Sequence, residues 1–150
     1  MIKEIKKLEE LINYLWEEKE NNKDILFKHK KEIKRVVDLL DKGKIRVVEN
    51  VDNQWIVNEY VKKAILLYFM VFKIRNIDFR GIKYRDKIPL KRNYKDVRVV
   101  PGAIVRYGSY LEPNVIVMPS FINIGAYVGA NTMVDTWVTV GSCAYVGRNV

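Results

Sequence analysis

Charged side chains in the C-terminal third of the sequence, among them Asp135 and Arg98, are of types that could do acid–base or anion-binding chemistry. Asp135 is the only acidic residue between Glu112 and the last residue. A carboxylate can orient an ammonium group and accept its proton, but an aspartate can equally cap a turn by accepting hydrogen bonds from backbone amides. The guanidinium of Arg98 could hold a substrate carboxylate through two parallel hydrogen bonds, or could be an ordinary surface charge. The residue types alone leave both alternatives open.

The single histidine and the single cysteine predict no further catalytic or metal site. His29 lies far in sequence from the C-terminal third, and we expect it to be exposed to solvent. Residues 98–150 contain no histidine, which excludes a metal site with three histidine ligands in that segment. Cys143 lies between small residues, so we expect a buried packing thiol rather than a nucleophile. One cysteine allows no intrachain disulfide, which is typical of cytoplasmic proteins.

The formal net charge of +9 does not predict nucleic-acid binding, because of how the charge is distributed. Lysines alternate with acidic residues over residues 1–97, as on solvated helices, and no zinc-finger, helix-turn-helix or RNP pattern accompanies them. The longest apolar run, residues 64–72, is far shorter than the roughly 20 residues that span a bilayer. The N-terminus also lacks the apolar segment of a signal peptide. We therefore expect a cytoplasmic protein without nucleic-acid or membrane partners.

An apolar residue recurs at every sixth position in the last third of the sequence. An α-helix repeats every 3.6 residues and a flat strand every two, so neither produces this period. A three-sided coil of short parallel strands does, with branched side chains pointing inward and glycines at the turns. Residues 98–150 are thus predicted to form the first coils of a left-handed parallel β-helix. The eight apolar positions are Ile104, Tyr110, Ile116, Ile122, Val128, Val134, Val140 and Val146.

Residues 1–97 are predicted to form a helical N-terminal domain with a small hairpin and a linker. Apolar residues spaced by three or four predict amphipathic helices, and a turn signal at Asp52-Asn53 predicts the hairpin. The expected fold class is α+β: a helical domain followed by a left-handed parallel β-helix of hexapeptide repeats, truncated by the end of the chain. The expected elements are helices over 2–20, about 30–41 and 59–72, a hairpin within 44–57 and a connecting segment over 73–97.

Several segments of the sequence resemble the bacterial tetrahydrodipicolinate N-succinyltransferase family. The most specific is Met133-Val-Asp-Thr-Trp137, inside a similar stretch from Phe121 to Ala144, and shorter N-terminal segments such as Gln54-Trp55 also match. The resemblance implies a homotrimer that transfers succinyl from succinyl-CoA to the amino group of ring-opened tetrahydrodipicolinate, in lysine and diaminopimelate biosynthesis. It implies active sites in the grooves between neighbouring β-helices, no metal and no permanently bound cofactor.

The resemblance also implies roles for individual residues. Arg98 corresponds to the family's substrate-binding arginine, and Asp135 to the aspartate that contacts the substrate amine and acts in catalysis; the CoA-binding residues stay unassigned. The sequence stops within a repeat after Val146-Gly147. We therefore expect the N-terminal half of a longer enzyme, inactive by itself. Two alternatives remain open: another hexapeptide acyltransferase that uses acetyl-CoA, and a non-catalytic truncated oligomerisation module.

Overall fold

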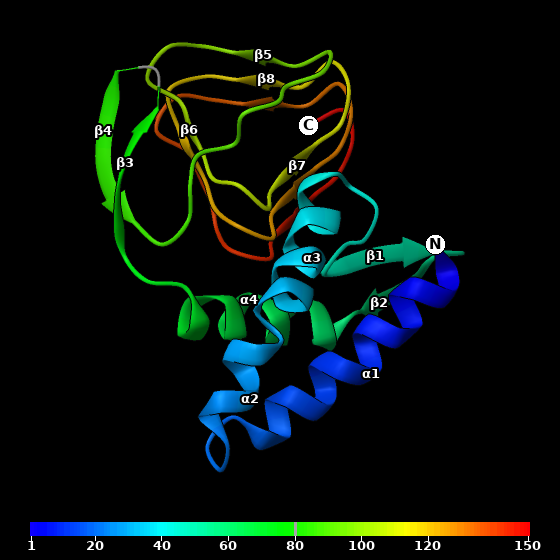
Figure 1. Cartoon of the computed structure of the whole chain (residues 1–150). Coiled ribbons are helices and arrows are strands. Elements are labelled where there is room, and N and C mark those ends of the chain that lie inside the picture. The colour runs from blue at the N-terminus through cyan, green and yellow to red at the C-terminus, as the bar shows by residue number, and fades with distance from the viewer. Residues whose placement is uncertain (80) are drawn as a thin grey trace.

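The computed structural model describes residues 1–79 and 81–150, and it places a group of helices against a three-sided stack of β-coils (Figure 1). The helices are α1 (Ile2–Glu18), α2 (Lys23–Lys28), α3 (Lys30–Asp41) and α4 (Glu59–Val71). The three helices expected from apolar spacing are confirmed, and the short α2 is an addition. No described helix combines the length and the apolar character that a membrane crossing requires.

Each helix buries the apolar face that its sequence predicts. Leu8, Ile12 and Leu15 lie on one side of α1, in the same apolar core as most of α3 and α4. The side chain of Asn22 caps α2 by accepting a hydrogen bond from the Ile25 amide at 3.3 Å. α4 is buried over most of its surface, because it lies between the other helices and the β-coils.

The predicted hairpin is present as β1 (Val48–Val51) and β2 (Gln54–Val57), which pair antiparallel. Its two turn residues, Asp52 and Asn53, both have positive φ (50° and 63°), as a two-residue type I′ turn requires. A second antiparallel ribbon, β3 (Arg75–Phe79) with β4 (Ile82–Asp86), lies within the segment 73–97, for which we expected only a connection to the coil. Its strands are mostly exposed, so they lack the apolar alternation that signals a half-buried strand.

The C-terminal third forms three parallel sheets of two-residue strands, so that successive coils stack on one another (Figure 1). The sheets are β5–β8–β11, β6–β9–β12 and β7–β10–β13. Paired residues lie 17 or 18 positions apart, which is three steps of about six. This confirms helices followed by a parallel β-coil. The strands are β5 (Arg98–Val99), β6 (Ile104–Val105), β7 (Tyr110–Leu111), β8 (Ile116–Val117), β9 (Phe121–Ile122), β10 (Tyr127–Val128), β11 (Met133–Val134), β12 (Thr139–Val140) and β13 (Tyr145–Val146).

The predicted register of the repeat is wrong by one residue in the first part of the coil. Ile104 is 43% exposed and points outward, whereas the next residue, Val105, is 1% exposed. The register becomes correct at Ile122, because the step from Val117 to Ile122 is five residues rather than six. Adjacent apolar residues hide this short step in the sequence. The residues packed inside the coil include Val105, Leu111, Val117, Ile122, Val128, Val134 and Val140.

The turns of the coil also differ from the prediction. Gly129, Gly141 and Gly147 do not adopt positive φ; the left-handed residues lie two positions further along, as at Asn131. Gly129 is needed for another reason: a Cβ there would lie 2.7 Å from backbone atoms of Gly147 in the next coil. The left-handed residues of the coil are Gly102, Gly108, Asn114, Gly125, Asn131, Trp137, Cys143 and Asn149.

The helices pack against one corner of the coil, and this contact fixes how the two parts sit together. Ile124, from the coil, is 1% exposed and belongs to the apolar core of the helices. A Cβ at Gly108 would lie 3.1 Å from Val37 of α3, and one at Gly125 would lie 3.0 Å from Ile65 of α4. Close backbone approach at these two glycines therefore lets α3 and α4 reach the coil.

Candidate functional site

Arg98 lies in the sheet β5–β8–β11, and Asp135 comes just after the last strand of that sheet. Arg98 pairs with Ile116, and Ile116 pairs with Met133, so one whole coil separates Arg98 from β11. Asp135 follows β11 directly. Both residues are exposed, whereas the neighbouring Val99 and Val134 pack into the coil. The fold therefore places one predicted site residue in this sheet and the other in the exposed turn that follows it, and within residues 1–79 and 81–150 no hydrogen bond or ion pair joins them.

Asp135 begins a tight turn that fixes its carboxylate. Its Oδ1 accepts a hydrogen bond from the Thr136 amide at 2.7 Å, and its carbonyl oxygen accepts one from the Val138 amide at 3.3 Å. One carboxylate oxygen of Asp135 thus caps the turn by accepting a hydrogen bond from a backbone amide, which was one of the two alternatives for this residue. The other oxygen, Oδ2, has no hydrogen bond within residues 1–79 and 81–150, so the same side chain can cap its turn and still bind a ligand.

Trp137 and the segment around it are unusually open to solvent. Residues 135–139 are all exposed, and Trp137 is 87% exposed. Its amide donates to the Pro119 carbonyl at 2.8 Å, which ties the turn to the coil before it. The carboxylate of Asp135 and the indole of Trp137 are therefore held on one turn at the corner that follows β11.

Glu112 is a buried carboxylate whose importance the sequence does not reveal. It accepts two hydrogen bonds from Arg148, at 2.9 and 3.1 Å, one from the Ala130 amide at 3.0 Å and a longer one from Arg46 at 3.4 Å. The guanidinium of Arg148 lowers the pKa of Glu112 to about 2. Arg46 also lies over the ring of Tyr127, 4.0 Å from its centroid. This cluster joins three coils to the segment before β1, so its role is structural.

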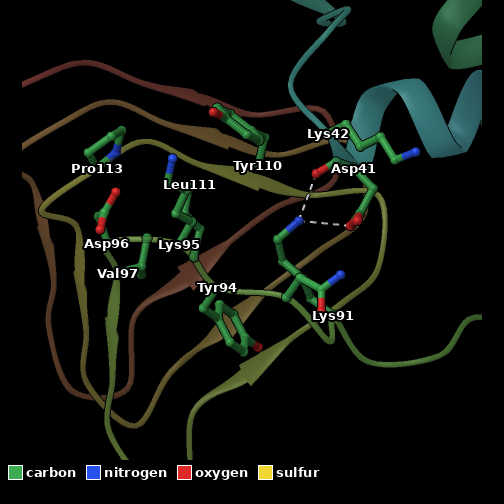
Figure 2. A pocket seen from close by; sticks show the side chains of 11 residues that line it. Asp41, Lys42, Lys91, Tyr94, Lys95, Asp96, Val97, Tyr110, Leu111 and Pro113 are labelled. Carbon is green, nitrogen blue, oxygen red and sulfur yellow. Dashed lines mark hydrogen bonds and ion pairs between the residues drawn. The ribbon is translucent and has the colours of Figure 1, made fainter.

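A cavity of about 380 Å³ lies where α3 ends against the first coil, and Figure 2 shows the side chains that line it. Lys91 is 5% exposed and its ammonium donates to the Asp41 carboxylate at 2.8 Å and to the Ser109 carbonyl at 2.9 Å. Asp41 also accepts from the Gly108 amide at 2.9 Å. The polar groups at the base of this cavity are therefore already paired, and neither Arg98 nor Asp135 lines it.

A second cavity, of about 410 Å³, lies between the ribbon β3–β4 and the coil. Ile82 and Tyr84 line it from the ribbon, and Phe121 lines it from β9. Arg106 forms an ion pair with Asp86 at 2.6 Å at its edge. The ribbon thus covers the β6–β9 face of the coil.

The remaining reactive residues contribute no second centre. Cys143 is half-buried, packs against the helical core and has its pKa raised by burial, so the predicted packing thiol is confirmed. His29, which we expected to be exposed to solvent, is only partly exposed, because it joins α2 to α3 and faces Glu32 at 3.7 Å. Among the described residues, no three His, Cys, Asp or Glu side chains cluster as metal ligands would.

A stack of three-sided parallel β-coils with a six-residue period defines a hexapeptide-repeat protein, and many proteins of this class are acyltransferases. A family model described as tetrahydrodipicolinate N-succinyltransferase N-terminal matches residues 7–71 of the chain. Residues 7–71 therefore match the N-terminal part of the tetrahydrodipicolinate N-succinyltransferase family, and relatives of that name match most of the chain.

Three relatives show how far the similarity extends, and each is named 2,3,4,5-tetrahydropyridine-2,6-dicarboxylate N-succinyltransferase. The Acinetobacter baylyi protein is 49% identical over 119 residues, which cover 74% of this chain and 44% of the relative. The Xylella fastidiosa protein is 50% identical over 127 residues, covering 78% and 46%. The Paramagnetospirillum magneticum protein is 41% identical over 154 aligned residues, covering 95% and 55%. The chain thus spans about half the length of the curated relatives it matches.

Proposed function

We propose that the protein is an acyltransferase that moves succinyl from succinyl-CoA to the amino group of ring-opened tetrahydrodipicolinate, in lysine and diaminopimelate biosynthesis. The observation that carries the proposal is the 41% identity to a relative of that name over 95% of the chain. The exposed carboxylate and guanidinium support it, because the acceptor carries both an amine and carboxylates.

Asp135 is the proposed catalytic residue of this reaction. Its free carboxylate oxygen would accept a hydrogen bond from the acceptor amine and take up the proton that the nitrogen loses. The nitrogen then attacks the thioester carbonyl of succinyl-CoA. The new C–N bond forms as the C–S bond breaks, and the CoA thiolate leaves and is protonated. Because Thr136 already holds Oδ1, the carboxylate is oriented before substrate binds.

Arg98 is the proposed substrate-binding residue. Its side chain makes no ion pair or hydrogen bond within the described residues, so its guanidinium is available to a substrate carboxylate. Since one coil separates it from β11, Arg98 and Asp135 can contact different groups of one extended ligand rather than the same atom. This spacing suits a substrate whose amine and distal carboxylate are several carbon atoms apart.

We further propose that the coil is a left-handed parallel β-helix and that the protein assembles as a cytoplasmic homotrimer with sites between neighbouring coils. The exposure of Met133, which is 52% exposed in β11 beside Asp135, supports the assembly. An apolar side chain of that size at a catalytic position is suited to coverage by a second subunit or by substrate. Succinyl-CoA is then a co-substrate, and no group is bound permanently.

The test compares the complete polypeptide encoded by the gene with its Asp135→Asn variant. Thiol release from succinyl-CoA is followed with a thiol-reactive dye, with and without tetrahydrodipicolinate, and acetyl-CoA serves as the alternative donor. We expect acceptor-dependent release with succinyl-CoA, and a loss of about 100-fold or more in kcat for the variant. The Asp52→Asn variant, which makes the same change in the exposed β1–β2 turn, should keep full activity.

Two results would contradict this proposal. A complete polypeptide that releases CoA faster from acetyl-CoA than from succinyl-CoA would assign it to a different acyl donor. An Asp135→Asn variant with normal kcat would remove Asp135 from the chemistry. The 150-residue chain, expressed alone, should bind CoA weakly and show little or no turnover, and turnover equal to that of the relatives would refute this expectation.

A further inference from the structure

Trp137 combines two properties that packing within the chain does not explain. It is 87% exposed, more than any other large apolar side chain among the described residues. Its backbone has a φ of +64°, a left-handed conformation that L side chains other than Asn and Asp disfavour. Large aromatic side chains normally gain stability through burial, and this one is neither buried nor in a favourable backbone conformation.

The other turns of the coil show what this position normally holds. Of the eight left-handed residues in the coil, six are Gly or Asn, the types that tolerate positive φ. The second exception is Cys143, whose side chain packs against the helical core and so has a structural reason to be there. Trp137 has no ring stacking or cation contact within residues 1–79 and 81–150. Packing within the described residues therefore gives no reason for a tryptophan at this position.

Trp137 and the proposed catalytic residue, Asp135, lie on the same turn, and both are exposed. The turn closes through the Val138 amide on the Asp135 carbonyl, and the Trp137 amide donates to Pro119 in the coil before it. The corner consequently offers an anionic group and a flat apolar ring, two residues apart and both exposed. A ligand with an amine next to a short aliphatic chain complements both groups, since an indole face binds methylene groups and cations.

We propose that Trp137 is the wall of the acceptor site and a specificity-determining residue: its indole packs against the carbon chain of an amino dicarboxylate whose amine contacts Asp135. This inference rests on the proposed function and adds the residue that selects the chain of the acceptor. The indole contributes to binding rather than to bond formation, so its loss raises the KM for the acceptor more than it lowers kcat.

The decisive variant is Trp137→Asn, because asparagine is favoured in the left-handed conformation and keeps the turn intact. In the complete polypeptide we expect a melting temperature at or above that of the wild type. We expect the KM for the acceptor to rise about tenfold or more, and the KM for succinyl-CoA to stay within about twofold. Trp137→Phe should recover most of the affinity, because it restores an aromatic face. Trp55→Phe, an exposed tryptophan of the β1–β2 hairpin, is the matched control with unchanged kinetics.

A binding measurement separates this inference from the proposed function. Tryptophan fluorescence is recorded while 2-aminopimelate, the acceptor without its oxo group, is added in the absence of CoA. We expect a change in emission in the wild type and in Trp55→Phe, and none in Trp137→Phe. An unchanged acceptor KM in Trp137→Asn overturns the inference even if succinyl transfer is normal. Loss of the oligomer in that variant, seen by light scattering with acceptor binding intact, also overturns it, because the indole would then be a subunit contact.

Discussion

The substitution Glu112→Gln tests whether the buried carboxylate holds the coils together. In the wild type this side chain receives two hydrogen bonds from Arg148 and one from the Ala130 amide. Glutamine keeps the size and one acceptor oxygen but brings an NH₂ group toward the guanidinium of Arg148. The variant therefore removes the charge pair, leaves Arg148 and Arg46 without their carboxylate, and changes little else.

The expected loss follows from the pKa of Glu112. An ordinary carboxyl pKa of 4.5 lowered to about 2 in the folded protein corresponds to about 3 kcal/mol of stability at neutral pH. The side chain of Arg148 is 64% exposed, so solvent screens the pair and the expected loss is about 2 kcal/mol. Because the folded pKa is the lower one, this stabilisation is complete above about pH 4.5 and disappears as the pH falls toward 2.

The assay is urea unfolding followed by circular dichroism at pH 7 and at pH 2.5. The wild type should exceed Glu112→Gln by about 2 kcal/mol at pH 7, and most of this gap should close at pH 2.5. Glu10→Gln, an exposed acid on α1, should match the wild type within about 0.5 kcal/mol. A gap below about 0.5 kcal/mol at pH 7, or one that persists unchanged at pH 2.5, would show that the charge pair contributes nothing.

Three further changes test packing, a buried ion pair and a thiol. Gly129→Ala should lower the free energy of unfolding, measured by urea titration, by about 1–3 kcal/mol, because its Cβ would lie 2.7 Å from backbone atoms of Gly147. Gly141→Ala is the control and should leave the free energy of unfolding unchanged, because a Cβ at Gly141 would have no neighbouring atom within 4 Å. Lys91→Met should cost about 3–5 kcal/mol by thermal melting, because a nearly buried carboxylate loses its cation. Cys143 should react more slowly with a thiol reagent at pH 8 in the native protein than in urea, because burial raises its pKa.

Each of these predictions has an outcome that contradicts it. Equal stabilities for Gly129→Ala and Gly141→Ala would mean that the coils do not approach as closely as the structure places them. A wild-type melting temperature for Lys91→Met would show that the paired carboxylate is solvated after all. A thiol at position 143 that reacts equally fast in both states would be an exposed one.

The sequence predicts those parts of the fold whose signals are local. The β1–β2 turn is readable because Asp52 and Asn53 tolerate left-handed backbone. The coil can be predicted because its six-residue period differs from that of a helix or a flat strand. The register of the coil before Ile122 cannot be predicted. Ile104-Val105 and the pairs after it are apolar at both positions, so composition cannot say which residue points inward. Pro119 lies in the one short step, where its fixed φ does not permit a left-handed turn residue.

The candidate site is only partly predictable for a physical reason. Spacing within the repeat can place Arg98 in the sheet β5–β8–β11 and Asp135 just after its last strand once the coil length is known. The spacing does not predict that one carboxylate oxygen of Asp135 accepts a hydrogen bond within its own turn while the other stays available, because this depends on the backbone geometry after β11. The contact of Lys91 with Asp41 joins residues that are 50 positions apart in the sequence, so no local sequence pattern predicts it.

The arrangement of the helices and hairpins explains why the chemistry is expected on one face of the coil. The β1–β2 hairpin reaches the β7–β10–β13 face, where Trp55 meets Tyr145 edge-on with ring centroids 5.1 Å apart. The β3–β4 ribbon lies beside the β6–β9 face (Figure 1), and Tyr84 and Phe121 line the cavity between them. The outer face of β5–β8–β11 keeps Met133 half exposed, and the two side chains suited to the reaction lie in this sheet and in the turn that follows it. The three sides of the coil thus differ, because a hairpin packs on each of two of them. The β5–β8–β11 side has no hairpin on it among the described residues, and a substrate or a second subunit can bind there.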